Sequence, residues 1–263
     1  MIGHEDKIKL FKRLADNDKL FHAYLFFGEQ QVGKFIFARH LANYLERGLF
    51  EEPHGILEEV LIISPNEKGT IGIDMAKNLT NFLYQKPVFS KKRTVIIRDA
   101  ENLTNEAQNA ILKIVEESPN SALIILIAQS EDLLLAPLAS RLQKIYFSRV
   151  ALEEISEKLN NFKIEGKKAD AKKIKSAVEE SFGRPGRAIE IIGGLKSDIK
   201  SLKLDDIVEN NRIDDFFEFL IIKLRKGNFR DIEAIKEVLK RMSLIKMFNV
   251  NKKLQLKTLQ KYI

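Results

Sequence analysis

The chain of 263 residues is 44% hydrophobic, so it can bury substantial cores and is long enough for about two domains or three small ones. It contains no cysteine, which excludes disulfides and Cys-ligated zinc, and no apolar run reaches the ~18 residues that a membrane-spanning helix needs. The first residues lack the apolar core of a secretory signal, and we therefore expect a cytoplasmic protein.

The net charge of +7 is unevenly distributed along the chain. Residues 1–150 carry 19 basic and 19 acidic side chains, whereas residues 151–263 carry 25 basic and 18 acidic ones, so the whole excess lies in the second part. A basic region favours an acidic partner such as nucleic acid. Lysine-rich helix faces exposed to solvent explain the same composition, and the charge alone leaves both interpretations open.

Up to residue 149, short apolar runs rich in β-branched and aromatic residues alternate with amphipathic segments. Such runs are typical of parallel strands buried on both faces, and the segments between them are typical of helices. The alternation predicts a three-layer α/β domain around a parallel five-stranded sheet. The expected strands are 23–28, 59–64, 93–98, 121–128 and 144–148, and the expected helices are 34–46, 71–84, 104–117 and 131–142.

The pattern changes after Arg149, where we expect helices and no further strand. The predicted organisation is an α/β domain over 1–149, a small helical domain over 150–203 and a second helical domain over 204–263. One helix of the last domain is predicted to have an apolar stripe, because its apolar residues recur at helical spacing. The stripe consists of Ile232, Ile235, Val238, Leu239 and Met242.

The first predicted strand is followed by GEQQVGKF, residues 28–35. In a phosphate-binding loop of the form G-x-x-x-x-G-K-[ST], backbone N–H groups at a helix N-terminus and the lysine surround anionic oxygens. Gly28, Gly33 and Lys34 match this pattern, whereas Phe35 stands where a hydroxyl should hold magnesium. Passive binding of a nucleotide or phosphate at Lys34 is therefore left open.

The second magnesium position of such sites is an Asp at the end of a later strand. In TVIIRDAENLT that position is Arg98, and Asp99 follows one residue late, where strand alternation would point it elsewhere. Shifting the alignment by one residue would place Asp99 at the second magnesium position. Because Phe35 and Arg98 both lack an oxygen ligand, we predict a degenerate site that does not hydrolyse ATP.

The segments HAYLFFGEQQVGK, TVIIRDAENLTNEAQNAILKIVEESPNSALIILIA, LASRLQ and GRPGRA occur in this order along the chain. Together they resemble the delta-prime subunits of bacterial DNA polymerase III clamp loaders, a family within the AAA+ ATPases. The likeness extends to the final NVNKKLQLKTLQKYI. It implies an AAA+ P-loop domain, a small helical lid over 150–203 and a helical collar for oligomerisation over 204–263.

In that family, ATP lies between neighbouring subunits of a ring, and a Ser-Arg-Cys motif supplies an arginine finger to the adjacent site. Ser140-Arg141-Leu142 resembles the motif, with Leu in place of Cys, which implies that Arg141 acts in trans. The alternative is an arginine that is favoured only by the end of a helix. The resemblance also implies that Arg187 faces the chain's own nucleotide, with Arg184 as the less favoured candidate.

The resemblance implies partners as well: the motor (gamma/tau) and delta subunits, primed DNA in the assembled complex and, indirectly, the sliding clamp. Many relatives carry a four-cysteine zinc module after the phosphate loop, but the corresponding span here has no cysteine. We therefore expect no zinc, no other metal and no required cofactor.

The leading hypothesis is a non-hydrolysing clamp-loader subunit that helps to load the sliding clamp on primed DNA. Two alternatives stay open. One is an active AAA+ ATPase, either a clamp-loader motor or a DNA remodeller, that holds magnesium through Asp99 or Glu101. The other is a basic scaffold that binds nucleic acid through its helices.

Overall fold

The computed structural model of the chain describes residues 1–160, 163–164, 167–168, 171–193, 204–209, 213–226, 232–248, 250–259 and 262. The chain forms two compact units, Met1–Ala188 and Ile189–Ile263. The finer division at residues 149 and 203 stays a prediction. Within the described part of the chain, every helix is too short or too polar to span a bilayer.

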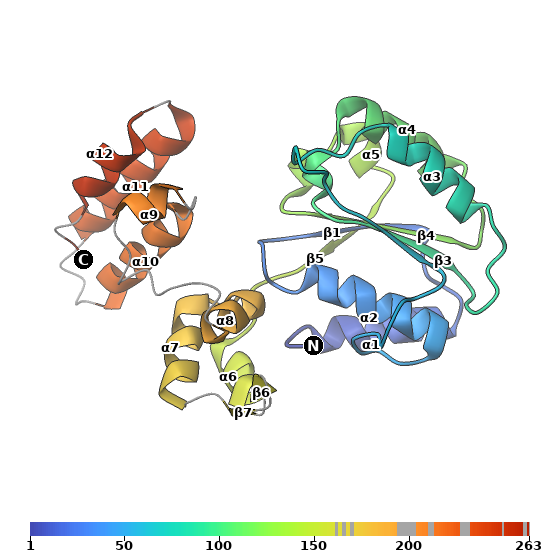
Figure 1. Cartoon of the computed structure of the whole chain (residues 1–263), viewed down its shortest axis with the longest axis horizontal. Coiled ribbons are helices and arrows are strands. Elements are labelled where there is room, and N and C mark those ends of the chain that lie inside the picture. Colours follow the sequence, from blue (N-terminus) through green and yellow to red (C-terminus); the bar gives the residue numbers. More distant parts are fainter. Residues whose placement is uncertain are drawn as a thin grey trace. The chain divides into compact units, whose positions relative to one another are not determined.

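Five parallel strands form the sheet of the first unit, in the order β2-β3-β4-β1-β5. This result confirms the predicted parallel five-stranded sheet (Figure 1). The central strand β4 is buried along its whole length, because both faces of the sheet are covered. The strands are β1 (Ala23–Phe27), β2 (Val60–Ile63), β3 (Arg93–Ile97), β4 (Ala122–Ala128) and β5 (Gln143–Tyr146).

Helices cover both faces of the sheet and produce three layers (Figure 1). One face carries α3 (Asp74–Leu83), α4 (Asn105–Glu116) and the short α5 (Ala136–Ala139). The other face carries α1 (Glu5–Asp16) and α2 (Lys34–Arg47). The predicted three-layer arrangement is therefore correct.

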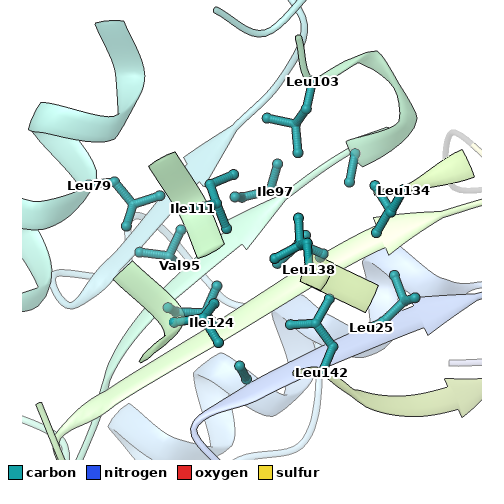
Figure 2. Packing of buried hydrophobic residues seen from close by; sticks show 14 of the residues in the cluster. Leu25, Leu79, Val95, Ile97, Leu103, Ile111, Ile124, Leu134, Leu138 and Leu142 are labelled. Atoms are coloured by element: carbon teal, nitrogen blue, oxygen red, sulfur yellow. The ribbon is translucent and has the colours of Figure 1, made fainter. Parts of the chain in front are cut away.

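Each face of the sheet has its own hydrophobic core, because successive strand residues point to opposite sides. Ile124 of β4 belongs to the core under α3, α4 and α5, and the next residue, Ile125, belongs to the core under α1 and α2. Figure 2 shows the first core, in which Leu79, Ile111 and Leu138 from the three helices meet the sheet.

The parallel sheet separates the loops into two groups. Loops that follow strands lie at the carboxyl edge of the sheet, and loops that precede strands lie at its amino edge. The residues after β1 and β3 are thus at the carboxyl edge, whereas the residues before β3 and β5 are at the amino edge. This division determines which candidate functional residues can act together.

The prediction of helices alone after Arg149 is wrong in one place. Between α6 (Leu152–Asn160) and α7 (Ala171–Ser181), β6 (Lys163–Ile164) pairs antiparallel with β7 (Lys167–Lys168). Strands of two residues are too short to produce the alternating pattern from which a strand is recognised. The next helix, α8 (Pro185–Ile192), begins at Pro185 as expected.

The predicted helix over 131–142 is also wrong in extent. A 3₁₀ turn, η2 (Glu131–Leu133), is followed by extended residues and then by the four-residue α5. A continuous helix over 131–142 is prevented by Pro137, which has no backbone N–H and is accommodated in the first turn of α5. The N–H of Leu135 donates to the side-chain oxygen of Gln108 at 2.7 Å rather than to a helical carbonyl.

The second unit consists of helices around its own core. Phe216, Phe217 and Leu220 on α10 are buried in it, as expected for an apolar helix inside a bundle. In the predicted stripe on α11, Val238 is buried, but Ile232 and Leu239 are exposed. The helices are α9 (Leu204–Glu209), α10 (Ile213–Lys226), α11 (Ile232–Met247) and α12 (Lys252–Lys257).

Candidate functional site

The loop GEQQVGKF leaves β1 at the carboxyl edge of the sheet and ends in the first turn of α2. We call residues 28–35 the phosphate loop, after the motif that they resemble. Gly28 and Gly33 have φ values of 138° and 106°, a region that favours glycine. A Cβ on Gly28 would lie only 2.3 Å from the carbonyl oxygen of Phe147. The first glycine of the motif is therefore required by the close approach of the backbone of another segment as well as by its own φ value.

Lys34 begins α2 and is buried beneath this loop. Its ammonium group donates to the carbonyl oxygen of Gly28 and, at 2.6 Å, to that of Glu29. Burial lowers the pKa of Lys34 to about 8, although the carboxylates of Glu101, Asp99 and Glu29 act to raise it. The lysine is thus still mostly protonated at neutral pH, and two of its three donors are bound to the loop itself.

The two residues that occupy the expected magnesium positions contact each other. Arg98 directly follows β3, and its guanidinium carbon lies 4.3 Å from the centroid of the Phe35 ring. A cation over an aromatic face contributes about 0.5–2 kcal/mol, depending on its exposure to water. The ring of Phe35 also packs against the core under α1 and α2. The structure therefore places an arginine–phenylalanine pair beside Lys34.

Asp99 lies beyond the end of β3 in the left-handed region, with a φ value of 48°, and precedes the 3₁₀ turn η1 (Ala100–Asn102). Strand alternation therefore does not decide where its side chain points. Its charge, like that of Glu101, acts on Lys34 and raises the lysine pKa. Both carboxylates thus belong to the electrostatic surroundings of the loop.

Ser140 and Arg141 follow α5 and are exposed. The Nε of Arg141 donates to Glu116 at 2.8 Å, and one of its terminal nitrogens donates to the hydroxyl of Ser140 at 3.1 Å. The Ser140 hydroxyl in turn donates to the carbonyl of Pro137 at 2.9 Å. Arg141 is therefore held at the surface by α4, by Ser140 and by its own helix.

Arg141 does not lie beside the chain's own phosphate loop. It precedes β5, and Gln143 of β5 is in register with Tyr24 of β1, so Arg141 is at the amino edge while Gly28 is at the carboxyl edge. The intervening residues of β1 span roughly 13 Å at about 3.3 Å per residue. The structure thus does not bring Arg141 together with Gly28, Gly33 and Lys34.

Arg187 lies on α8 and is 3% exposed, with its guanidinium carbon 5.1 Å from the ring centroid of Phe182. Arg184 lies 6.0 Å from the same centroid, and its Nε donates to the carbonyl of Ser181 at 3.3 Å. The first turn of α8 also contacts the phosphate loop, because the N–H of Gly186 donates to the carbonyl of Gln31 at 3.0 Å.

Sequence reasoning missed further contacts that fix the phosphate loop. Glu29 forms an ion pair with Arg149, with nitrogen–oxygen distances of 2.9 and 3.0 Å. The Nε2 of His4 lies 2.9 Å from the carbonyl oxygen of Val32. These partners are far apart in the sequence and match no motif, so the sequence gives no signal for them.

The family model and several curated relatives name DNA polymerase III subunits. A family model described as "DNA polymerase III, delta subunit" matches residues 3–151. DNA polymerase III subunit gamma/tau of Mycobacterium tuberculosis is 30% identical over 154 residues, which cover 54% of this chain and 27% of that protein. DNA polymerase III subunit delta' of Pseudomonas aeruginosa is 26% identical over 149 residues, which cover 50% of this chain and 44% of that protein. The chain thus spans less than half the length of these curated relatives.

A solved structure has a similar fold. The crystal structure of a DNA polymerase III gamma subunit-related protein from Thermotoga maritima aligns with 97% of this chain and 97% of that chain. The TM-score is 0.54 and the sequence identity is 19%. At this identity the likeness establishes the fold and leaves the activity to be argued from the residues.

Proposed function

This chain belongs to the DNA polymerase III delta subunit family, and we propose that it is a clamp-loader subunit that does not hydrolyse ATP. In this proposal it supplies Arg141 to the ATP site of a neighbouring motor subunit. Its partners are the motor (gamma/tau) and delta subunits, with the sliding clamp engaged indirectly and primed DNA present in the assembled complex. The proposed location is the cytoplasm.

The observation that carries the proposal is the position of Arg141 at the opposite sheet edge from the chain's own phosphate loop. An exposed guanidinium at that edge is out of reach of an anion bound at Lys34. In this proposal it exchanges its pairing with Glu116 for a site on another subunit. The fork of N–H donors on arginine suits the charge that develops on a transferred phosphoryl group.

The lack of hydrolysis is supported by the contact between Phe35 and Arg98. A phenyl ring offers no oxygen ligand, and a guanidinium carries the same sign of charge as a magnesium ion. The pair therefore disfavours the metal on two grounds, ligand chemistry and electrostatic repulsion. Passive binding of a nucleotide at Lys34 is compatible with the proposal, and Arg187 would then help to hold it.

The test is a reconstituted complex of this chain with the motor and delta subunits, the sliding clamp and primed DNA. Removing an arginine finger lowers phosphoryl transfer by about 10³-fold or more. Arg141→Ala should therefore abolish single-turnover hydrolysis at the one motor site that this chain completes, while the other motor sites continue. Arg141→Lys should rescue little, because a point charge does not replace the planar fork.

Lys144→Ala is the matched control, since Lys144 is an exposed cation close to Arg141 and pairs with Glu131 instead. It should leave hydrolysis and assembly unchanged. Glu116→Gln removes the charged partner of Arg141 but keeps the arginine itself. Single-turnover hydrolysis should therefore persist in this variant. Unchanged single-turnover hydrolysis with Arg141→Ala in a fully assembled complex would contradict the proposal.

The competing function is an active ATPase that uses Asp99 or Glu101 for magnesium, and it is favoured by the action of both charges on Lys34. The purified chain distinguishes the two functions. Our proposal predicts no magnesium-dependent turnover, whereas turnover that disappears with Lys34→Ala would establish the ATPase.

A further inference from the structure

The segment that contains β6, β7 and the first half of α7 is rich in lysine. Residues 163–176 carry six lysines and two acidic residues, a net charge of +4 against +7 for the whole chain. We call the six the lysine cluster: Lys163, Lys167, Lys168, Lys172, Lys173 and Lys175. Charge runs are common on solvated helices, so the cluster is informative only through its placement.

The pairing of β6 with β7 sets positively charged residues opposite each other. Lys163 is in register with Lys168, and Ile164 is in register with Lys167. Like charges directly opposite in an antiparallel pair destabilise it, and strands of two residues have few backbone hydrogen bonds to offset that cost. The pair therefore keeps an arrangement of charge that favours nearby anions at the expense of its own stability.

The charges of α7 run against the dipole of the helix. In α1 and α6, acidic residues stand in the first turn and a basic residue stands in the last, which is the favourable order. α7 has no acidic residue in its first turn and no basic residue in its last. Lys172 and Lys173 stand in the first turn instead, and Glu179 and Glu180 stand near the end. This order lowers the stability of the helix and concentrates positive charge at the end next to β7.

The packing of α7 leaves its lysines at the surface. α6 packs against α7 (Figure 1). Ile174, Ala177 and Val178 are buried and form one face of the helix. The lysines at 172, 173 and 175 lie off this face and are exposed. Because four residues of chain span at most about 14 Å, the lysines of β7 and of α7 belong to one surface.

We propose that the lysine cluster binds the phosphate backbone of duplex DNA. Duplex DNA carries one negative charge per about 1.7 Å of its axis, so it presents several phosphates to a cluster of this size. Lysines that neutralise phosphates release the counterions held by the DNA, which drives binding. The repulsion within the β6–β7 pair and along α7 would be relieved at the same time.

A protein partner fits this surface less well than DNA. The large apolar side chains of α7, Ile174 and Val178, are buried, so the described part of the helix offers no large apolar anchor of the kind that dominates protein interfaces. A single strand also fits less well than a duplex. Residues 163–181 contain no aromatic side chain on which an unpaired base could stack.

The first test measures the Kd of the purified full-length chain for a short blunt DNA duplex over a series of salt concentrations. Each phosphate contact contributes about 0.9 to the slope of log K against log salt. Replacing Lys172, Lys173 and Lys175 together by Gln should therefore reduce the slope by about 2–3 and raise Kd about tenfold or more at low salt. An unchanged Kd and slope would overturn the proposal.

The matched control removes the same amount of charge elsewhere. Lys9, Lys19 and Lys77 are exposed lysines outside the cluster. Replacing all three by Gln should leave Kd and the salt slope unchanged. An equal loss of affinity in this control would show that only the net charge matters and would contradict a defined surface.

The β6–β7 pair is tested by hydrogen exchange as well as by affinity. Adding the duplex to the unaltered protein should slow exchange at the backbone N–H groups of β6 and β7, because the phosphates offset the repulsion between Lys163 and Lys168. Lys163→Gln with Lys168→Gln should slow the same exchange without DNA and should raise Kd. Exchange in the unaltered protein that DNA does not slow would contradict the proposal.

Two competitors test the identity of the partner. A single strand of the same sequence should bind more weakly than the duplex, and polyglutamate at the same charge concentration should displace little of the bound duplex. Tighter binding of the single strand would contradict the choice of duplex. Equal displacement by polyglutamate would show that the cluster binds any acidic chain, and the proposal would be wrong.

This proposal goes beyond the proposed function, which places primed DNA only in the assembled complex. The assays contain no ATP and no partner subunit, and they use neither Arg141 nor residues 28–35. Normal duplex binding by the cluster variants, together with loss of hydrolysis in Arg141→Ala, would refute only the DNA surface. Loss of duplex binding by the cluster variants, together with no effect of Arg141→Ala, would refute only the role of Arg141.

Discussion

Lys34 brings a charged group into the protein at the residue where α2 begins. Its ammonium group is bound to carbonyls of the same loop, and burial lowers its pKa to about 8 from an ordinary value of 10.5. The loop therefore satisfies the lysine internally. This arrangement has a measurable consequence for stability at alkaline pH.

Between pH 8 and 10.5, the unfolded chain holds the Lys34 proton while the folded chain releases it. The free energy of unfolding contributed by Lys34 should therefore rise with pH across this window, by up to about 3 kcal/mol. Chemical denaturation of the unaltered protein and of Lys34→Met should show this as a difference that grows above pH 8.

The Lys34→Met variant is the reference for the unaltered protein, because the other lysines and the tyrosines titrate equally in the two proteins. The difference in unfolding free energy should be constant between pH 6 and 7, where Lys34 is protonated in both states. A difference that stays constant up to pH 10.5 would show that burial does not lower the pKa of Lys34.

At the same scale, the assignment of Phe35 and Arg98 to the expected magnesium positions rests on spacing within a motif and stays a prediction. The contact between Phe35 and Arg98 could not be predicted. The two residues belong to different elements, and only the register of β1, β4 and β3 brings those elements together. The structure thus shows that the two residues that depart from the motif, Phe35 and Arg98, are in contact.

At the scale of elements, the phosphate loop depends on how closely β1 and the segment after β5 approach each other. The space at Gly28 is closed by the backbone oxygen of Phe147, which cannot rotate away as a side chain could. Gly28→Ala should therefore lower the free energy of unfolding by about 2–4 kcal/mol, combining an unfavourable φ value with steric overlap.

Gly48→Ala is the control for the φ value alone, because Gly48 has a φ value of 76° and no atom within 4 Å of the Cβ position. Its expected cost is about 1 kcal/mol. Thermal or chemical denaturation measures both variants. Equal losses for Gly28→Ala and Gly48→Ala would show that the backbone approach at Phe147 is not limiting.

The sheet could be predicted because strands such as β4 are continuous apolar runs that are short and rich in β-branched residues. The interruption of the predicted helix over 131–142 is signalled in the sequence by Pro137, which cannot stand in the interior of a helix. The bond from Leu135 to Gln108 on a different helix leaves no such pattern.

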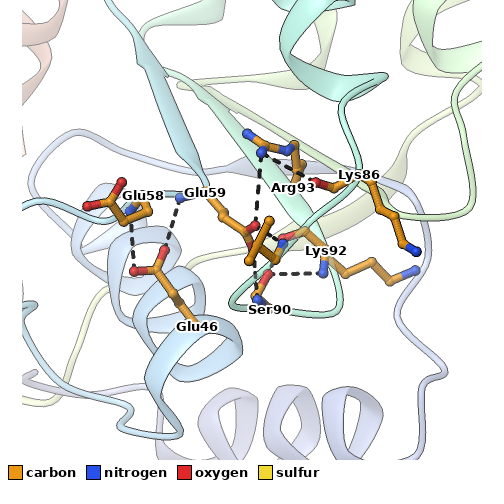
Figure 3. A network of polar contacts seen from close by, with 8 residues as sticks. Glu46, Glu58, Glu59, Lys86, Ser90, Lys92 and Arg93 are labelled. Carbon is orange, nitrogen blue, oxygen red and sulfur yellow. Dashed lines mark hydrogen bonds and ion pairs between the residues drawn. The ribbon is translucent and has the colours of Figure 1, made fainter.

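The buried carboxylate of Glu59 accepts hydrogen bonds from the N–H groups of Val88 and Ser90 (Figure 3). These contacts could not be predicted either, because the bonded groups lie about thirty residues away and leave no pattern in the sequence.

At the scale of the whole molecule, the parallel sheet separates two kinds of site. The phosphate loop lies at the carboxyl edge, whereas Arg141 lies at the amino edge. A chain arranged in this way can present the amino edge to neighbours whatever happens at residues 28–35. This separation is compatible with a subunit that completes the active site of another subunit.

The most direct test of this account is a distance in the assembled complex with a non-hydrolysable ATP analogue. The account predicts that a guanidinium nitrogen of Arg141 lies about 3 Å from a γ-phosphate oxygen bound by the neighbouring motor subunit. A separation of more than about 10 Å from every γ-phosphate would exceed any charge-assisted hydrogen bond and would contradict it. A magnesium–nucleotide complex coordinated by residues 28–35 of this chain would contradict it equally.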